Sequence, residues 1–401
     1  MLWGPNVSVW QKFEGKGKRV GWALAHRSPL IAILQKFNLK AKESFQGEAI
    51  MSRKRIVSVG IVLVVLCGLM LTGYASQAGP RKARLLVKLP DYCNTPDGMA
   101  LLPDGGFVLS VPNYNDPNAG AFIMKVSAKN KVSKFFVPPP HPRTGNAAPM
   151  GICLAPSGDF YYADNQFSPD TPQTSRVMRI VVRDGKAQEA VTVVSGLNVA
   201  NAVAIKGDYM YVSETIMVPG SKPLISGIFR FKIGDEGVQL KTPLETDPHL
   251  IATIKSYNEA IGYGADGLCF DSKGNLYCGN FADGTIHKIT FDAQDNVTSN
   301  KIFVNNPNLK CADGLFCDLK TDRIIVADMV QNAVQFVHPD GSVEMIAING
   351  DTDGADGSID QPCEAILRGN EVIISNMDWP FPGIVNTAWD KPYTLSVVKL
   401  K

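Results

Sequence analysis

The sequence predicts an all-β fold, a six-bladed β-propeller of four-stranded antiparallel blades. The first observation is a β-hairpin pattern at residues 264–281, GADGLCFDSKGNLYCGNF, where two apolar runs with a period of two flank the turn residues SKGN. The second is repetition, because related hairpins occur six times along the chain. The third is spacing: the repeats follow one another at roughly 50-residue intervals, close to the length of a four-stranded propeller blade.

The six hairpins align on one position at the start of their first strand. The equivalent residues are Asp97, Met150, Asn201, Asp266, Asp313 and Cys363. Each of the first five hairpins is followed by two more strand-like runs, whereas the sixth is followed only by YTLSVVKL. An unassigned strand, ARLLVKL, lies at 83–89. We therefore expect this N-terminal strand to complete the last blade, because a ring closed in that way has no exposed strand edge.

The chain divides into three parts. Residues 83–401 are the propeller, one large domain because the repeat covers the whole stretch. Residues 51–78 have a basic flank, an apolar core at 56–71 and small residues at the end, as in a secretory signal peptide. A membrane anchor is the alternative, although about 16 apolar residues are fewer than the roughly 20 that span a bilayer. Residues 1–50 are a basic N-terminal extension, either an over-extended reading frame or a targeting segment.

This organisation predicts a secreted or periplasmic protein, or one anchored in a membrane by residues 56–71. The formal net charge is +2, but residues 1–75 hold 11 of the 40 Lys and Arg and 3 of the 38 Asp and Glu. The remainder therefore carries about −6 and shows no basic stripe for a nucleic acid. We expect a monomer that binds a small-molecule substrate or ligand.

Of the eight cysteines, seven follow the apolar core. Four fall on strands and are expected to be small buried hydrophobes: Cys153, Cys269, Cys278 and Cys317. Cys93, Cys311 and Cys363 lie near blade starts, where an exported context allows one disulfide among them, with the pairing open. No CxxC spacing occurs, which argues against zinc and thiol redox chemistry.

The candidate site follows from propeller geometry. The innermost strand of each blade runs along the central channel, so its first residue lies at the same rim in every blade. Four of the six positions carry oxygen-bearing side chains: Asp97, Asn201, Asp266 and Asp313. Three carboxylates and a carboxamide at one point favour a hard cation, and oxygen ligands suit Ca2+, although another divalent cation is possible. The alternative is that Asp-Gly and Asn-Ala merely start strands after turns.

These DG-headed hairpins, with an acid in blade one, Asn in blade three and Asp in blade four, resemble those of the SMP-30/gluconolactonase/LRE-like propellers, relatives of the paraoxonases. The resemblance covers essentially residues 83–401. It implies a bound divalent cation, usually calcium, at which lactones or phosphotriesters are hydrolysed. It also implies that Asp97 and Asn201 are metal ligands and that Asp266 is both a ligand and the acid/base residue. A paraoxonase-like register adds Asp313 as a ligand.

Two positions depart from the family pattern. Blade one carries Asp97 where the family has the longer Glu, and blade two carries Met150 where it has Asn or a catalytic His. No GxSxG or HExxH motif occurs, so metal-assisted hydrolysis of a lactone or related ester, with Asp266 moving the proton, is the expected activity. The alternative is a non-enzymatic propeller that binds a small ligand or a protein and holds a structural cation. Met150 favours the alternative, and the acidic rim favours the enzyme.

The loops that leave the second strands are expected to shape a pocket at the same rim. They begin at Asn113, Asp164, Glu214, Asn280, Asp328 and Asn376. In the last of these loops Trp379, Phe381 and Trp389 either wall a ligand site or pack on the blade edge. The nearby segment 351–360, DTDGADGSID, is either a cluster of Asp-Gly turns or a second calcium site. It is not an EF-hand, because Pro362 stands where the motif requires Glu.

Overall fold

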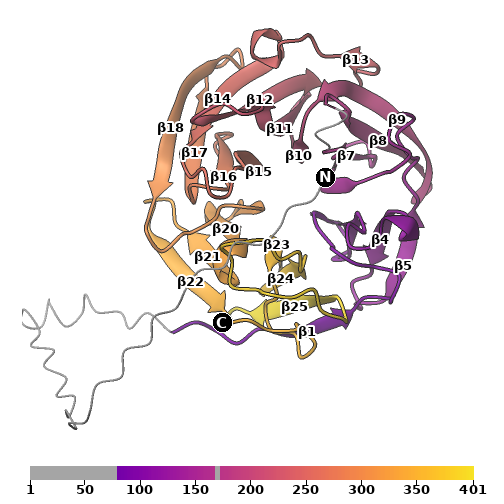
Figure 1. The fold of residues 1–401 in the computed structure, drawn as a ribbon, viewed down its shortest axis with the longest axis vertical. Coiled ribbons are helices and arrows are strands. Elements are labelled where there is room, and N and C mark those ends of the chain that lie inside the picture. Colours follow the sequence, from indigo (N-terminus) through magenta and orange to yellow (C-terminus); the bar gives the residue numbers. More distant parts are fainter. Residues whose placement is uncertain (1–78, 168–171) are drawn as a thin grey trace, which may run out of the picture. The chain divides into compact units, whose positions relative to one another are not determined.

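The structure, a computed structural model, describes residues 79–401 except 168–171, so the predictions for residues 1–50 and 51–78 concern parts of the chain outside the described residues. The described part contains β-strands and three short 3-10 helices, and no α-helix. No helix in this part is long and apolar enough to cross a membrane. Six antiparallel sheets form a ring around a central axis (Figure 1). The predicted six-bladed propeller is confirmed.

Each blade is a sheet whose first strand lies innermost. Blade one contains β2 (Met99–Leu101), β3 (Phe107–Val111), β4 (Phe122–Val126) and β5 (Val132–Phe136), and blade two contains β6 (Pro149–Leu154), β7 (Phe160–Asp164), β8 (Ser175–Arg183) and β9 (Lys186–Leu197). Blade three contains β10 (Ala200–Lys206), β11 (Tyr209–Val218), β12 (Leu224–Lys232) and β14 (Leu250–Ser256), and blade four contains β15 (Ala265–Phe270), β16 (Leu276–Asn280), β17 (Thr285–Phe291) and β18 (Val297–Asn305). Blade five contains β19 (Leu315–Asp318), β20 (Arg323–Asp328), β21 (Ala333–Val337) and β22 (Val343–Ile348).

Blade six closes the ring as the sequence predicts. Its strands are β23 (Pro362–Arg368), β24 (Glu371–Asn376), β25 (Thr394–Lys399) and β1 (Arg84–Lys88). β1 pairs antiparallel with β25, with Arg84 opposite Val397 and Lys88 opposite Thr394. In Figure 1 the indigo start of the propeller therefore lies beside its yellow end. The N-terminal strand covers an edge of β25 that would otherwise be free to pair with another chain.

One blade has an additional short strand. β13 (Val238–Gln239) pairs in parallel with the outer edge of β9, with Val238 opposite Val194. The chain between β12 and β14 thus crosses from blade three to cover the neighbouring blade. This covering strand protects an outer edge in the same way that β1 protects blade six.

The apolar core lies between neighbouring blades. In blade four, Leu276 and Cys278 pack against Tyr211 of blade three, whereas Tyr277 packs on the other face, among residues of blade five such as Leu315. Successive side chains of a strand point to opposite faces of the sheet, so a strand with both faces buried joins two interfaces. The ring is therefore stabilised by repeated blade-to-blade packing around the axis.

Small residues let the innermost strands approach one another. A Cβ atom on Gly98 would lie 2.7 Å from Met150 O of the next blade, and one on Gly151 would lie 2.7 Å from Asn201 O. Both distances are far below an ordinary van der Waals contact. The glycine that follows each candidate site residue in blades one and two is thus required by the close packing at the axis.

A second polar position recurs once per blade, at the end of the second strand or just after it. These buried residues, here called the clasp residues, are Asn113, Asp164, Glu214, Asn280, Asp328 and Asn376. Five of them accept a hydrogen bond from a backbone N–H ahead of the first strand of their own blade, whereas Asn280 accepts one from Ser256 Oγ at the end of β14 in blade three. For example, Ala148 N lies 2.7 Å from Asp164 Oδ1. The clasp residues therefore hold the two strand ends of one blade together rather than line a pocket.

Candidate functional site

A β-bulge turns the candidate residues of two blades toward the axis. In blade four, the three steps of β15 from Ala265 to Leu268 match only two steps of β16, so Asp266 lies on the bulge. In blade three the corresponding bulge in β10 carries Asn201. An extra residue bends the strand and re-aims its side chain. The bulge explains why a residue inside a ladder can face the channel instead of a neighbouring blade.

The structure brings all four predicted residues together at the axis. Asn201 Nδ2 donates a 2.7 Å hydrogen bond to Asp266 Oδ2. The carboxyls of Asp266 and Asp313 are also hydrogen-bond partners, and the charge of Asp97 acts on both of them. We call Asp97, Asn201, Asp266 and Asp313 the axial residues. They come from four blades, yet their side chains form one polar group.

Burial and mutual repulsion favour protons on the axial carboxyls. Burial raises the pKa of Asp97 to about 7, against the lowering effect of the Gly98 N–H. Burial and then the charge of Asp97 raise the pKa of Asp266 to about 8. The pKa of Asp313 lies well above its usual range, first through burial and then through the charges of Asp266 and Asp97. Without a cation, these carboxyls therefore keep their protons to higher pH than an ordinary Asp does.

A fifth oxygen ligand candidate, Glu364, was missed in the alignment of the repeats. The aligned residue of blade six is Cys363, but a bulge in β23 shifts the register by one residue, between Pro362 and Glu364. Burial raises the pKa of Glu364 to about 8, and the charges of Asp97 and Asp266 add to that effect. Cys363 instead donates from its thiol to Pro96 O, at 3.2 Å. Allowing a one-residue offset in the alignment would have found the acid.

Glu364 also lines the central channel. This cavity of about 1200 Å3 is bounded by first strands of all six blades, with apolar residues such as Ile152 and Leu268 along its length. The axial residues lie at the starts of those strands, whereas the channel follows their remaining length. Glu364 thus connects the axial group with the channel.

Blade two contributes an apolar side chain in place of an oxygen. Tyr114 Oη lies 3.3 Å from Met150 Sδ, and the Tyr114 ring stacks on Trp379 with centroids 4.9 Å apart. Burial raises the pKa of Tyr114 well above its usual range, and the charge of Asp97 adds to this. The Tyr114 hydroxyl therefore lies near the axial residues, on the side of the axis where blade two carries Met150 instead of an oxygen ligand.

The three aromatic residues of the long blade-six loop have different surroundings. Trp379 contacts Tyr114 and so adjoins the axial group, while Phe381 packs on the same apolar cluster as Met150, with its ring 6.3 Å from that of Phe281. Trp389 is 55% exposed and lines a separate surface depression. Of the predicted pocket wall, Trp379 therefore adjoins the axial group through Tyr114, whereas Phe381 and Trp389 line the surface depression.

The donor chemistry of the axial residues fits a hard cation. Four carboxyl groups, including Glu364, and the Asn201 amide offer only oxygen ligands once the amide presents its oxygen. Among residues 79–167 and 172–401, no basic side chain forms an ion pair with these carboxyls. In this structure the side chains of the axial residues lie farther apart than the ligands of a bound metal ion do. Within the described residues, no three His, Cys, Asp or Glu side chains are grouped closely enough to hold an ion.

The predicted disulfide is not formed. Cys93, Cys311 and Cys363 are free and buried, as the remaining cysteines of the described residues are also free. Cys93 packs in the apolar cluster shared by blades one and six, whereas Cys311 and Cys363 belong to a different cluster. Burial raises the pKa of the Cys93 thiol to about 12, so these cysteines act as small apolar residues.

Comparison with known proteins identifies the fold. No family model and no curated protein matches the sequence. Similar solved structures include a gluconolactonase from Xanthomonas campestris, 13% identical over 81% of this chain and 97% of that one, with a TM-score of 0.51. Another is a calcium-binding protein, regucalcin, from Agrobacterium tumefaciens, which is 12% identical over 80% of this chain and 94% of its own, with a TM-score of 0.50. A luciferin-regenerating enzyme is 10% identical over 80% of this chain and 96% of its own, with a TM-score of 0.54.

The chain therefore has the fold of the six-bladed propellers to which gluconolactonase and regucalcin belong, as the sequence resemblance implies.

Proposed function

We propose that this protein is an exported, calcium-dependent hydrolase of lactones or related esters. The observation that carries the proposal is the axial group, in which the buried carboxyls of Asp97, Asp266 and Asp313 lie with that of Glu364, one from each of four blades, without a basic ion-pair partner among the described residues. Such a group is unfavourable on its own and becomes favourable around a divalent cation. Two of the similar solved structures, a gluconolactonase and a calcium-binding protein, support it.

The axial residues have distinct roles in this proposal. Asp97, Asn201, Asp266 and Asp313 would hold the cation, which supplies a Lewis acid for a carbonyl oxygen. Asp266 accepts a proton from the attacking water and returns it to the alkoxide as the ester C–O bond breaks. Asn201 Nδ2 donates to Asp266 Oδ2 at 2.7 Å without a cation, and the amide would turn to present Oδ1 to the bound ion. Asp313 shares a hydrogen bond with Asp266 and modulates its basicity.

The test is a substrate panel assayed with calcium and with a chelator. Aldonolactones, acyl-homoserine lactones, aryl esters and phosphotriesters cover the candidate classes. We expect hydrolysis of a lactone or ester that requires calcium and falls about 10²- to 10⁴-fold in Asp266→Asn. This substitution keeps an oxygen ligand and removes the basic group, so kcat should fall more than calcium affinity. Inactivity of the calcium-loaded protein across the panel would contradict the proposal.

The second candidate function is a binding module with a structural cation. Met150 favours it, because the blade-two sector is filled by a thioether and the Tyr114 hydroxyl instead of a ligand or a general base. In that case the calcium-loaded protein is inactive on the whole panel, yet calcium raises its melting temperature. The same assays, combined with thermal melting, therefore separate the two functions.

Export is supported by the basic flank, the apolar segment 56–71 and the small residues that follow. We expect the mature protein to begin between residues 75 and 79 and to be a monomer outside the cytoplasmic membrane. Mass spectrometry of the fractionated native protein determines its N-terminus. Recovery of the uncleaved chain in the membrane fraction would instead support an anchor.

A further inference from the structure

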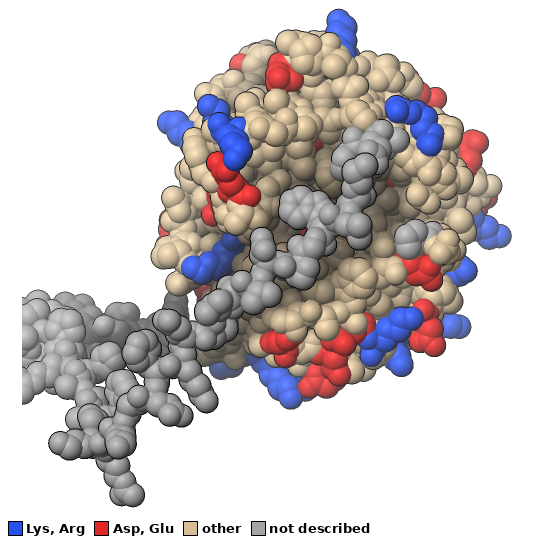
Figure 2. Space-filling view, viewed as in Figure 1, with Lys and Arg blue, Asp and Glu red and all other residues tan. Residues whose placement is uncertain are grey.

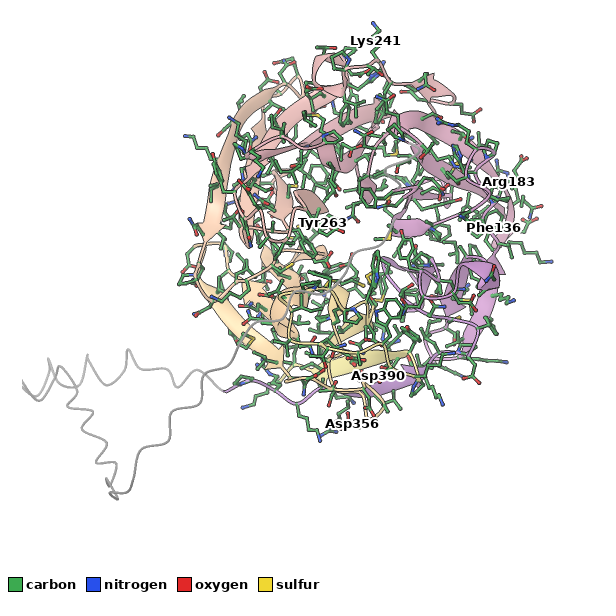
Figure 3. The ribbon with its side chains drawn as sticks, in the orientation of Figure 1. Phe136, Arg183, Lys241, Tyr263, Asp356 and Asp390 are labelled. Atoms are coloured by element: carbon green, nitrogen blue, oxygen red, sulfur yellow. The ribbon has the colours of Figure 1, made fainter. Side chains whose placement is uncertain are left out.

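A second group of oxygen atoms lies away from the axis, in the loops of blade six. The segment between β22 and β23 meets the segment between β24 and β25: Thr387 Oγ1 donates to Asp351 Oδ2 at 2.5 Å, and Gln361 Nε2 donates to Trp379 O at 2.5 Å. Figure 2 shows acidic side chains on the edge of the ring where β25 and β1 lie, and Figure 3 places Asp390 and Asp356 there.

Two carboxyls of this group are buried without a basic partner. Asp360 and Asp378 are 3% and 1% exposed, and neither forms an ion pair with a Lys, Arg or His of the described residues. Burial and the charges of Asp378 and Asp390 raise the pKa of Asp360 to about 8. Burial raises the pKa of Asp378 to about 7, against the lowering effect of the Asp390 N–H that donates to it, and the Asp390 charge adds to the rise. The two carboxyls thus lie near each other and near Asp390, without a basic side chain beside them in the part of the chain that the structure describes.

The side-chain amides near these carboxyls donate hydrogen bonds from their nitrogens, whereas their oxygens accept none. Asn386 Nδ2 donates to Asp378 Oδ1 at 2.8 Å, and the Asn386 amide lowers the pKa of both Asp360 and Asp378, so it lies between the two carboxyls. Asn386 Oδ1, Asp360 Oδ1 and Gln361 Oε1 are all buried without a hydrogen-bond partner. Asn386 and Gln361 are 2% and 0% exposed. A buried acceptor without a donor is unfavourable, and three of them occur here together.

We propose that Asp360, Asp378 and Asn386 bind a second divalent cation, calcium by its preference for oxygen ligands, at a site separate from the axial residues. One cation would neutralise both carboxylates and satisfy the bare amide oxygen after the Asn386 amide rotates by 180°. Gly354 keeps the carboxyl of Asp360 accessible to the loop, since a Cβ atom there would lie 2.9 Å from Asp360 Oδ2.

The position of this blade-six site gives the cation a structural role. Thr394, the first residue of β25, donates from Oγ1 to Gly354 O at 3.1 Å and lies opposite Lys88 of the closing strand β1. Asn115 of blade one donates to Tyr393 Oη and to Asp378 O. A cation at this site therefore links both loops of blade six to the strand that closes the ring and to blade one.

Calcium titration of the chelator-treated full-length chain tests the proposal. We expect wild type to bind one more calcium ion per chain than Asp360→Asn, or the same number with one Kd at least about 10-fold weaker in the variant. Asp356→Asn is the matched control, since Asp356 is an exposed acid in the same loop whose carboxyl accepts Ser358 N at 2.8 Å. This control should bind calcium as wild type does.

A second variant decides the question if Asp360→Asn does not fold. Asn386→Asp adds a carboxylate, so we expect tighter calcium binding and a lower melting temperature in chelator than wild type. The axial variant Asp266→Asn should retain calcium at the blade-six site, which distinguishes this proposal from the proposed function. The proposal is overturned if Asp360→Asn binds calcium as Asp356→Asn does, or if Asn386→Asp leaves both calcium affinity and the melting temperature unchanged.

Discussion

The axial residues and the clasp residues differ in what their oxygens contact. Both sets recur from blade to blade, are largely buried and consist of Asp, Asn or Glu. Each clasp residue accepts a hydrogen bond from a neighbouring N–H or O–H donor, as Glu214 does from the backbone N–H of Asn198 and Val199. The axial carboxyls instead contact one another across the axis.

This difference separates structural from functional polar residues. A buried polar group with its own donor stabilises the fold, whereas buried carboxyls that face one another destabilise it unless something binds between them. In a repeat protein, the sequence pattern of the two sets looks alike. Their energetic consequences should be opposite, and the following predictions test that contrast.

The largest effect on stability is expected for Asp164→Ala. This clasp residue accepts from Arg176 Nε at 2.6 Å, and both side chains are buried. Removing one partner of a buried ion pair leaves an uncompensated charge, so the free energy of unfolding should fall by about 3 to 5 kcal/mol. Urea unfolding followed by tryptophan fluorescence measures it. A loss below about 1 kcal/mol would show that the clasp is dispensable.

Asp266→Asn should have the opposite effect on the calcium-free protein. The substitution removes one of several mutually repelling carboxyls, so unfolding free energy in chelator should be unchanged or higher by about 1 kcal/mol. Calcium should then stabilise this variant less than wild type. The same urea experiment with and without calcium gives both values. A loss in chelator as large as that of Asp164→Ala would make Asp266 a structural residue.

The axial carboxyls also predict a pH dependence. Their folded-state pKa values, about 7 for Asp97 and about 8 for Asp266, lie above the value of about 3.9 for an unfolded Asp. The folded state therefore retains protons that the unfolded state has lost, and this contribution to stability is complete below about pH 4 and lost as pH rises to about 8.

Thermal melting in chelator from pH 4 to 9 measures this loss. We expect the melting temperature to fall more steeply with pH in wild type than in Asp266→Asn, with calcium reducing the fall in wild type. Identical pH profiles for the two proteins in chelator would contradict the assignment of the titration to the axial residues.

The smallest effect is expected for Met150→Asn, which adds an oxygen to the blade-two sector. Tyr114 Oη, now 3.3 Å from Met150 Sδ, can donate to the new amide. Calcium should bind a few-fold more tightly, equivalent to about 1 kcal/mol. Calorimetric titration measures the affinity, and Met150→Leu is the control that keeps the apolar volume. Equal affinities in the two variants would exclude blade two from the site.

The sequence predicted the fold well because hairpin pattern, repeat length and the spare N-terminal strand all agree on a closed ring. It also predicted that Asp97, Asn201, Asp266 and Asp313 converge, because equivalent positions in a propeller meet at one rim, and in the structure Asn201 donates to Asp266. Glu364 was missed because a bulge in β23 shifts the inward-facing position by one residue. A bulge cannot be recognised from the composition or the hydrophobic period of the sequence.

The sequence could not assign the clasp residues, and of the blade-six site it indicated only the segment 351–360. Polarity at Asp164 is visible in the sequence, but the 2.7 Å contact with Ala148 N that makes it structural is not. The blade-six site depends on two irregular loops that contribute Asp360, Asp378 and Asn386, and loops without periodicity do not reveal which side chains meet. The roles of these polar residues depend on their hydrogen-bond partners in the fold and not on the residue types alone.

The most direct test of the axial site is anomalous diffraction from crystals grown with calcium. The account predicts a peak on the ring axis at about 2.3 to 2.6 Å from oxygens of Asp97, Asn201 and Asp266, with the Asn201 amide turned so that Oδ1 faces the ion. An axis without a peak in calcium-soaked crystals, with Asn201 Nδ2 still donating to Asp266, would contradict it.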